Sequence, residues 1–420
     1  MKRTLVIAGI LTLGLFVYKT YAAPPQPTLL RKSCADPWLL RYDGKFYLTQ
    51  TGATKILVEE SETLEGLGAP TCQKTLAYDS ALDKTVTELG YKGVSGTWSP
   101  EIHHFTEDEF PGCAGWYMFL ALRDSAPGDS SRVKGVVLKS LTNSPAGPYG
   151  HPVTGERFSS QPLLDKDGAA VAGWVIGQSS LVIREGKWKG AYGMFVTEKG
   201  RGSESFHQEI VVARMKTPWQ LASDFSVMTA PTQHWETIGS GASNKKPGLI
   251  YPKVVEGATA VYGDRGDVYV IYSGSGYWSN YGLGQLTWTG GDPLKQSSWI
   301  KYDGNPVFGA ADANGNHLPG VDLQGAGHAS FFSDAEGKRH MVFHAYPYNS
   351  SDTEKTVDGV TLAPRQKSKS RNAYVAPYRI DYSKDNGAGK GVFTAGDSTQ
   401  TNDNQEKHSS TRHSYVTNHF

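Results

Sequence analysis

Five polar residues recur at one phase of a long internal repeat, and this repeat limits the folds open to the chain. Each opens a similar phrase: a polar residue, a short apolar run, a glycine-containing turn and an aromatic-rich run. The five stand 65 to 78 positions apart: Asp36, Glu101, Gln178, Glu256 and His328. A repeat that opens on a strand hairpin is typical of a propeller, in which the innermost strand of every blade lines the central axis. The sequence therefore predicts an all-β, five-bladed β-propeller whose repeated polar residues converge on one funnel.

The apolar segments favour strands over long helices. They are short, and 48 glycines suit tight turns between them. Segments 116–120 and 268–272 are apolar throughout, without strict alternation. Such runs indicate strands that are covered on both faces, as in stacked blades. A two-sheet sandwich is the main competing fold, but the long repeat argues against it.

The N-terminus has the pattern of an export signal. Lys2 and Arg3 precede an apolar stretch at 5–17, which is shorter than the roughly 20 residues of a spanning helix. Small residues at the cleavage spacing predict a secretory signal peptide over residues 1–22, and an uncleaved anchor is the weaker alternative. We therefore expect a secreted, extracellular protein that has no membrane segment after cleavage.

Composition sets the remaining boundaries. The propeller domain is expected over 29–394, and the polar segment 395–420 is predicted to be a disordered tail because it has too few apolar residues to bury. The 42 basic and 41 acidic residues give a net charge of +1 without a basic block, which argues against nucleic acid as a partner. We expect a monomer. In an oxidising compartment the cysteines predict one disulfide and one free thiol, and the pairing stays open among Cys34, Cys72 and Cys113.

Phrases at the repeat positions resemble glycoside hydrolase family 43, whose members are five-bladed propellers that act on arabinose- and xylose-containing polysaccharides. Segment 35–37 (Ala-Asp-Pro) is similar to the first-blade motif, and segment 96–103 is similar to the tryptophan-alanine-proline-glutamate signature. Segment 255–257 (Val-Glu-Gly) is similar to the general-acid motif. Further matches to the fourth and fifth blades lie at 272–278, 281–284 and 325–330. The residues of these segments are most similar to those of the exo-acting α-L-arabinofuranosidases.

The resemblance implies an inverting mechanism with two carboxyl groups about 6.5–9.5 Å apart. Asp36 is expected to be the general base and Glu256 the general acid. Family members carry a second aspartate in blade three that raises the pKa of the acid. Gln178 takes that place here, since it lies eight residues before Gly186 as Asp36 lies eight before Gly44, and a shift of one residue would put Gly177 there.

Without that aspartate, Glu256 is expected to be protonated less often at neutral pH. Three outcomes follow: another acid substitutes, the enzyme is slow or needs low pH, or the site binds sugar without turnover. The acids close enough in sequence to substitute are Asp165, Asp167 and Glu185.

Four further residues are candidates for substrate binding. Trp98 is a stacking platform for a sugar ring or a core residue, and Arg371 reaches the pocket or forms a surface salt bridge. Tyr277 and Trp278 form a pocket wall or pack between blades. We assign Glu101 no chemistry.

No cofactor is required for the chemistry. The resemblance implies that His328 faces a structural calcium ion or its water shell, and the alternative is a buried histidine with its hydrogen bonds satisfied.

The sequence thus predicts a secreted inverting glycoside hydrolase that releases terminal α-L-arabinofuranosyl units from arabinan or arabinoxylan of the plant cell wall. The alternatives are a β-xylosidase or an endo-arabinanase on the same scaffold, or a weakly active or inactive glycan-binding propeller.

Overall fold

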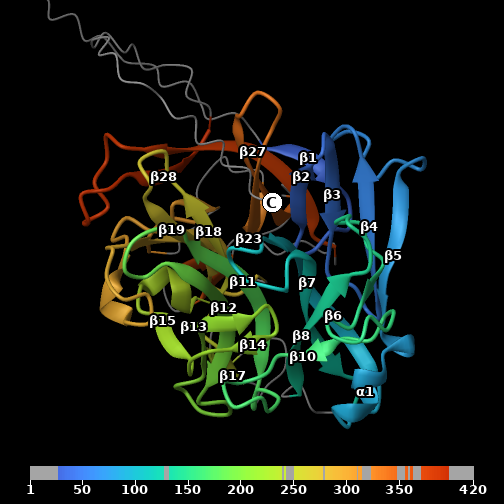
Figure 1. The fold of residues 1–420 in the computed structure, drawn as a ribbon. Coiled ribbons are helices and arrows are strands. Elements are labelled where there is room, and N and C mark those ends of the chain that lie inside the picture. Colours follow the sequence, from blue (N-terminus) through green and yellow to red (C-terminus); the bar gives the residue numbers. More distant parts are fainter. Residues whose placement is uncertain are drawn as a thin grey trace, which may run out of the picture.

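Five small sheets form a ring, which confirms the all-β, five-bladed propeller (Figure 1). The computed structural model describes residues 27–126, 132–238, 241–242, 250–277, 280–309, 311–314, 323–347, 355–357, 360–362 and 370–396. The predicted signal peptide at 1–22 and nearly all of the predicted tail at 395–420 lie outside these residues. Within them, helix is confined to short segments: η1 (Ser80–Leu82), α1 (Lys84–Glu88), η2 (His234–Thr237) and η3 (Gln296–Ser298).

In the first three blades the innermost strand comes first in the chain. Blade one contains β2 (Trp38–Tyr42), β3 (Lys45–Thr49), β4 (Lys55–Ser61) and β5 (Gln73–Asp79). Blade two contains β6 (Val94–Phe105), β7 (Gly115–Asp124), β8 (Val133–Ser140), β9 (Tyr149–Gly150) and β10 (Gln161–Pro162). Blade three contains β11 (Val175–Ile183), β12 (Gly190–Lys199), β13 (His207–Thr217), β14 (Gln220–Leu221) and β15 (Ser226–Thr229).

The last two blades follow the same order, and two short hairpins lie outside the blades. Blade four contains β18 (Val255–Tyr262), β19 (Val268–Gly274), β20 (Gly282–Trp288), β21 (Trp299–Lys301) and β22 (Phe308–Gly309). Blade five contains β23 (Leu323–Ser333), β24 (Arg339–Pro347), β27 (Asn372–Asp381), β28 (Val392–Ala395) and β1 (Thr28–Arg31). The hairpins pair β16 (Gly241–Ala242) with β17 (Ile250–Tyr251), and β25 (Lys355–Val357) with β26 (Val360–Leu362).

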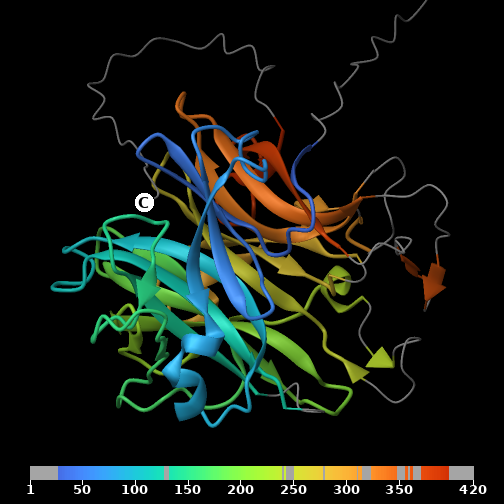
Figure 2. The same ribbon diagram turned by 90° about the vertical axis from the view of Figure 1, so that its right-hand side faces the viewer.

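The first strand of the chain closes the ring. β1 pairs antiparallel with β27, so blade five combines the N-terminal strand with strands from the last hundred residues (Figures 1 and 2). Just after β1, the Cys34 amide donates to the Arg371 carbonyl over 2.7 Å. This closure brings the start of blade one against the segment that carries Arg371.

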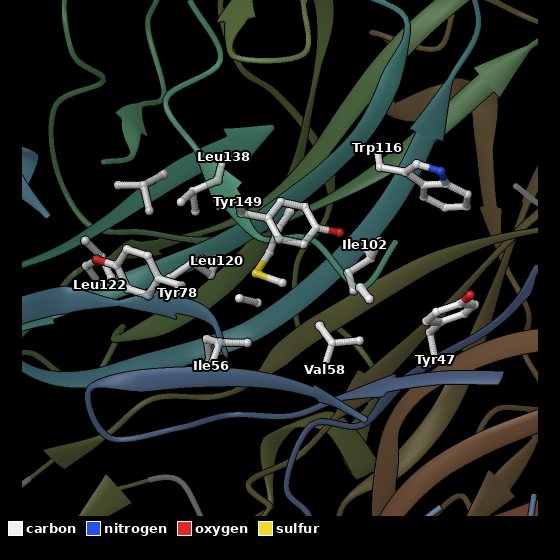
Figure 3. Packing of buried hydrophobic residues seen from close by; sticks show 14 of the residues in the cluster. Tyr47, Ile56, Val58, Tyr78, Ile102, Trp116, Leu120, Leu122, Leu138 and Tyr149 are labelled. Atoms are coloured by element: carbon white, nitrogen blue, oxygen red, sulfur yellow. The ribbon is translucent and has the colours of Figure 1, made fainter. Parts of the chain in front are cut away.

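The core is divided into five clusters, one at each interface between neighbouring blades. Figure 3 shows the interface of blades one and two, where Ile56, Val58 and Tyr78 face Leu120 and Leu138. Along an inner strand the side chains alternate between the two neighbouring blades, as in β19, where Val270 packs toward blade three and Ile271 toward blade five. Both faces are buried, which confirms the prediction drawn from the apolar runs.

Each innermost strand has a residue in the left-handed region at or just before its start or at a bulge. These residues are Asp36 (φ 51°), Ser99 (φ 48°), Gly177 (φ 65°), Gly257 (φ 59°) and His328 (φ 54°), and β23 has a second one, Gly325 (φ 63°). In blades two to five the strand pairing shifts register at this point, as a β-bulge does. The repeated backbone feature therefore coincides with Asp36 and His328. In blades three and four it lies one residue from the predicted positions, Gln178 and Glu256. In blade two it lies two residues from the predicted position, Glu101.

Two features bear on the predictions about compartment. Cys34, Cys72 and Cys113 are all free thiols, so the expected disulfide is not found. Cys34 is buried and Cys72 partly buried in the same cluster between blades five and one. In the described part of the chain, no helix has the length and apolar character needed to cross a membrane.

Candidate active site

A single cavity of about 580 Å³ collects most of the predicted site residues. The predicted residues that line it are Asp36, Trp98, Glu101, Glu256, Tyr277, His328 and Arg371. Gln178 lies on β11, but its side chain and the whole of Trp278 lie outside the described residues. The cavity is therefore built from the starts of the inner strands, as the repeat predicted, together with Arg371 beside the closing blade.

Asp36 is held in its ionised form by the groups around it. The Thr51 hydroxyl donates to Oδ2 over 2.5 Å, and Arg371 Nη1 donates to Oδ1 over 3.1 Å. His328 Nδ1 lies 3.6 Å from Oδ1. Burial by itself raises the pKa of Asp36, but Arg371, His328 and His344 more than offset it, so the pKa lies well below its usual range.

His344 connects Asp36 to Arg371 as a neutral ring. Its Nε2 lies 3.2 Å from Arg371 Nη1. Its Nδ1 accepts from the backbone amide of Asp36 over 3.1 Å and lies 3.2 Å from Asp36 Oδ1. Burial lowers the pKa of His344 to about 3, with Arg371 adding to the effect, so the ring stays neutral beside the carboxylate.

Glu256 has the opposite electrostatic setting. The hydroxyl of buried Tyr281 donates to its Oε1 over 2.9 Å, and the Tyr281 ring stacks on the His344 ring with centroids 5.5 Å apart. Burial raises the pKa of Glu256 to about 7; the charge of Asp36 adds to this, while Tyr281 and Arg371 oppose it. The cavity therefore pairs one carboxylate that stays ionised with one carboxyl group that holds its proton up to neutral pH.

This pKa changes the expectation drawn from the missing blade-three aspartate. Gly177 has the left-handed backbone of Asp36 and lines the cavity, whereas the side chain of Gln178 lies outside the described residues. A Cβ atom at Gly177 would meet no atom within 4 Å, so among the described residues this place has room for a side chain. The raised pKa of Glu256 arises from burial and from Asp36, without a charge at this position.

The acids that were candidates to substitute do not reach the cavity. Asp165 caps its own turn, where Oδ1 accepts from the amides of Asp167 and Ala169 over 3.0 and 2.9 Å. Asp167 and Glu185 are exposed, and neither lines the cavity. The acidic residue that blade three contributes is Glu198 on β12, which forms an ion pair with Arg201.

Glu101 belongs to a neutral chain of hydrogen bonds beside the axis. Its Oε2 lies 2.9 Å from His103 Nε2, and His103 Nδ1 lies 2.9 Å from the Ser180 hydroxyl. Burial raises the pKa of Glu101 to about 8 and lowers the pKa of His103 to about 3. The protonated acid therefore donates to the neutral ring, which suits a structural role.

Three of the predicted substrate residues line the cavity as arginine–aromatic pairs. The Arg371 guanidinium lies over the Tyr277 ring at 4.5 Å, and Arg123 lies over the Trp98 ring at 5.6 Å. Arg371 is thus part of the site rather than of a surface salt bridge. Trp98 is half-buried and lines the cavity, where a sugar-stacking platform is expected.

His328 is packed tightly at the centre. Its amide donates to the Ser273 hydroxyl over 2.8 Å, and a Cβ atom at Gly257 would lie 3.0 Å from Nδ1. Among the described residues no three His, Cys, Asp or Glu side chains cluster as metal ligands, although calcium takes six to eight oxygen ligands. The described residues therefore do not form a calcium cage, and calcium near His328 stays a prediction.

Sequence reasoning missed several partners of the two acids. Thr51, His344 and Tyr281 supply the direct contacts, and Glu198 and Arg123 line the wall. Tyr281 stands in a segment that matched the family, so its motif was a usable signal. His344 lies inside an apolar strand and carries no motif.

Comparison with known proteins gives a consistent result. The model for glycosyl hydrolases family 43 matches residues 26–365. An extracellular exo-α-(1→5)-L-arabinofuranosidase of Streptomyces avermitilis is 27% identical over 354 residues, which cover 82% of this chain and 62% of that protein. An α-L-arabinofuranosidase B of Pyricularia oryzae is 25% identical over 369 residues, which cover 83% and 64%. The chain thus spans less than two thirds of the length of these curated relatives.

Solved structures share the fold at lower identity. An α-L-arabinofuranosidase from Lactobacillus brevis has a TM-score of 0.58 at 19% identity, covering 84% of this chain and 92% of that one. An endo-1,4-β-xylanase from Bacteroides thetaiotaomicron has a TM-score of 0.55 at 20% identity, covering 88% and 96%. The match of the family model over most of the propeller, on a five-bladed fold with paired carboxyl groups, shows that the chain belongs to glycoside hydrolase family 43.

Proposed function

We propose that this protein is a secreted, inverting glycosidase that releases terminal α-L-arabinofuranosyl units from arabinan or arabinoxylan. The observation that carries the proposal is the opposite electrostatic setting of Asp36 and Glu256 in one cavity. Hydrolysis with inversion needs one carboxylate to activate water and one carboxylic acid to protonate the leaving oxygen. Two neighbouring carboxyl groups whose pKa values are pushed apart supply those two states at the same pH.

Asp36 suits the role of general base. Among the described residues its Oδ2 accepts only the Thr51 hydroxyl, which leaves a second lone pair on that oxygen for a water molecule. Arg371 and His344 hold the other oxygen and keep the group ionised. The water would then attack the anomeric carbon as its proton passes to Asp36.

Glu256 suits the role of general acid. Its Oε1 is fixed by the Tyr281 hydroxyl, and its pKa of about 7 keeps the proton available under mildly acidic conditions. The proton would pass to the glycosidic oxygen as the bond to the anomeric carbon breaks. Glu256 then regains a proton from solvent while Asp36 loses one, which resets the site.

The preference for arabinofuranosyl units is supported by the two relatives named as arabinofuranosidases and by the wording of the motifs. Export is supported by the predicted signal at 1–22 and by the extracellular relative. Sequencing of the mature N-terminus tests export, with cleavage after Ala22 expected.

Hydrolysis of an aryl α-L-arabinofuranoside, an aryl β-D-xyloside and linear arabinan tests the substrate. We expect turnover of the arabinofuranoside and release of single arabinose units from arabinan. Preferred turnover of the xyloside would identify a xylosidase, internal cleavage of arabinan would identify an endo-acting enzyme, and no turnover would support a glycan-binding propeller.

Two variants separate the roles of the acids. Glu256→Gln should lose about 10²–10⁴-fold on arabino-oligosaccharides and much less on an aryl glycoside whose leaving group needs no proton. Asp36→Asn should lose a similar factor on both substrates, because water attack is needed in each. Glu336→Gln, on an exposed turn of blade five, is the matched control and should retain full activity. Full activity in either site variant would remove that residue from its role.

A further inference from the structure

Three arginines of the described residues line the cavity, and each lies over an aromatic ring that also lines it. The guanidinium-to-centroid distances are 4.5 Å for Arg371 over Tyr277, 5.2 Å for Arg201 over Phe206 and 5.6 Å for Arg123 over Trp98. Stacking of this kind fixes the plane of the guanidinium while leaving its edge free to donate hydrogen bonds.

Two of these arginines already have an internal carboxylate. Arg371 pairs with Asp36 and Arg201 pairs with Glu198. Arg123 differs, because it forms no hydrogen bond or ion pair with any residue in the described ranges, and its buried Nε has no partner. Arg123 therefore has no internal acceptor in these ranges, and its guanidinium can pair with an acceptor that enters the cavity.

Within the described residues of the cavity, no carboxylate compensates the charge of Arg123. The carboxyl groups that these residues place in the lining are Asp36, Glu101, Glu198 and Glu256. Asp36 and Glu198 are paired with Arg371 and Arg201. Glu101 keeps its proton up to about pH 8, and Glu256 keeps its proton up to about pH 7. Below neutral pH the cavity therefore carries a free guanidinium beside a half-buried tryptophan.

We propose that Arg123 binds a substrate carboxylate, so that the enzyme favours arabinofuranosyl units whose acceptor chain carries a neighbouring uronic acid. The inference rests on the proposed function and adds the substrate class. A guanidinium edge matches a carboxylate with two parallel hydrogen bonds, which a neutral hydroxyl cannot accept in the same way. Trp98, which lines the same cavity, is a candidate to contact the apolar side of the same sugar.

The experiment compares two forms of one substrate in each variant. The acidic form is an arabinofuranosyl-substituted xylo-oligosaccharide with a glucuronosyl group on the neighbouring unit, and the neutral form is the same oligosaccharide after reduction of that carboxyl group. The readout is the ratio of kcat/KM for the acidic form to kcat/KM for the neutral form. This ratio is internal to each preparation, so partial misfolding lowers both rates and leaves it unchanged.

We expect a ratio of about tenfold or more in the wild-type protein, as a charge-assisted pair provides. The ratio should fall to about one in Arg123→Gln and to an intermediate value in Arg123→Lys, which keeps the charge and loses the fork. Arg265→Ala is the matched control, since it removes an exposed arginine that lies over Tyr382 at 4.1 Å outside the cavity, and its ratio should stay at the wild-type value.

The failures of the two proposals are distinguishable. A wild-type ratio of one, with both forms hydrolysed, would overturn the role of Arg123 and leave the arabinofuranosidase assignment intact. A raised wild-type ratio that survives in Arg123→Gln would assign the carboxylate to another group and also overturn it. Absence of arabinose release from every substrate would instead refute the proposed function.

Discussion

Arg371 Nη1 lies 3.1 Å from Oδ1 of Asp36, although 335 positions separate the two residues in the chain. The contact exists because β1 closes the last blade against β27, which places the segment before blade one beside the segment before β27. The proposed base is therefore completed by the same strand pairing that closes the propeller. Folding of the ring and ionisation of the site are coupled through this pair.

Replacement of Arg371 tests its effect on the base. Arg371 lowers the pKa of Asp36, so Arg371→Met should raise that pKa and move the acid limb of the kcat/KM profile to higher pH. Arg371→Lys keeps a positive charge and should move the limb less. An acid limb that stays in place in Arg371→Met would show that this charge does not control the base.

The basic limb of the pH profile reports on the acid. Glu256 must be protonated to act, so kcat/KM should fall as pH rises through about 7. The Tyr281 hydrogen bond stabilises the ionised form, so Tyr281→Phe should raise the pKa of Glu256 and move this limb to higher pH. A limb that moves to lower pH in Tyr281→Phe would mean that Tyr281 instead favours the protonated acid.

A carboxylate introduced at Gly177 in blade three tests whether a charge at this position changes the pKa of Glu256. Gly177 has the left-handed backbone that aspartate and asparagine tolerate, and a side chain there has free space. Gly177→Asp should raise the pKa of Glu256 by like-charge repulsion and extend activity to higher pH, whereas Gly177→Asn, with the same shape and no charge, should not. Equal profiles for the two variants would show that this position does not reach the acid. Gln178→Asp, one residue away, should shift the limb less.

Gly257 combines a left-handed backbone conformation with close packing against His328. Its φ of 59° disfavours a side chain, and a Cβ atom would lie 3.0 Å from His328 Nδ1. Gly257→Ala should lower the free energy of unfolding by about 1–3 kcal/mol and reduce activity. Gly266→Ala in the same blade has a φ of 79° and open space, so it isolates the backbone cost and should destabilise less. Equal losses in chemical denaturation would argue against a contact with His328.

The repeat was enough to predict the propeller because each phrase encodes the same hairpin and its apolar runs face two neighbours at once. The prediction of register was less accurate for a physical reason. Asp36 and Gln178 were aligned because each lies eight residues before a turn glycine. However, Gly44 stands directly before β3, whereas Gly186 stands four residues before β12. The turns differ in length, so equal counts from the glycines reach Asp36 in one blade and the neighbour of Gly177 in another.

The pKa values of the site residues could not be predicted from the sequence. A missing aspartate removes one neighbouring charge, whereas burial is the largest contribution to the pKa of Glu256. Burial depends on how five blades enclose one cavity, which no local motif specifies. The contact of His344 with Asp36 is likewise a property of ring closure, because 308 positions separate the two residues.

The most direct test of the inverting mechanism is the anomeric configuration of the first product. Proton NMR measures it while an aryl α-L-arabinofuranoside is hydrolysed. Asp36 acting through water and Glu256 acting on the leaving oxygen predict that β-L-arabinofuranose appears first and then mutarotates. Initial release of the α-anomer would contradict the account, because it would require a covalent intermediate on the protein in place of a water held by Asp36.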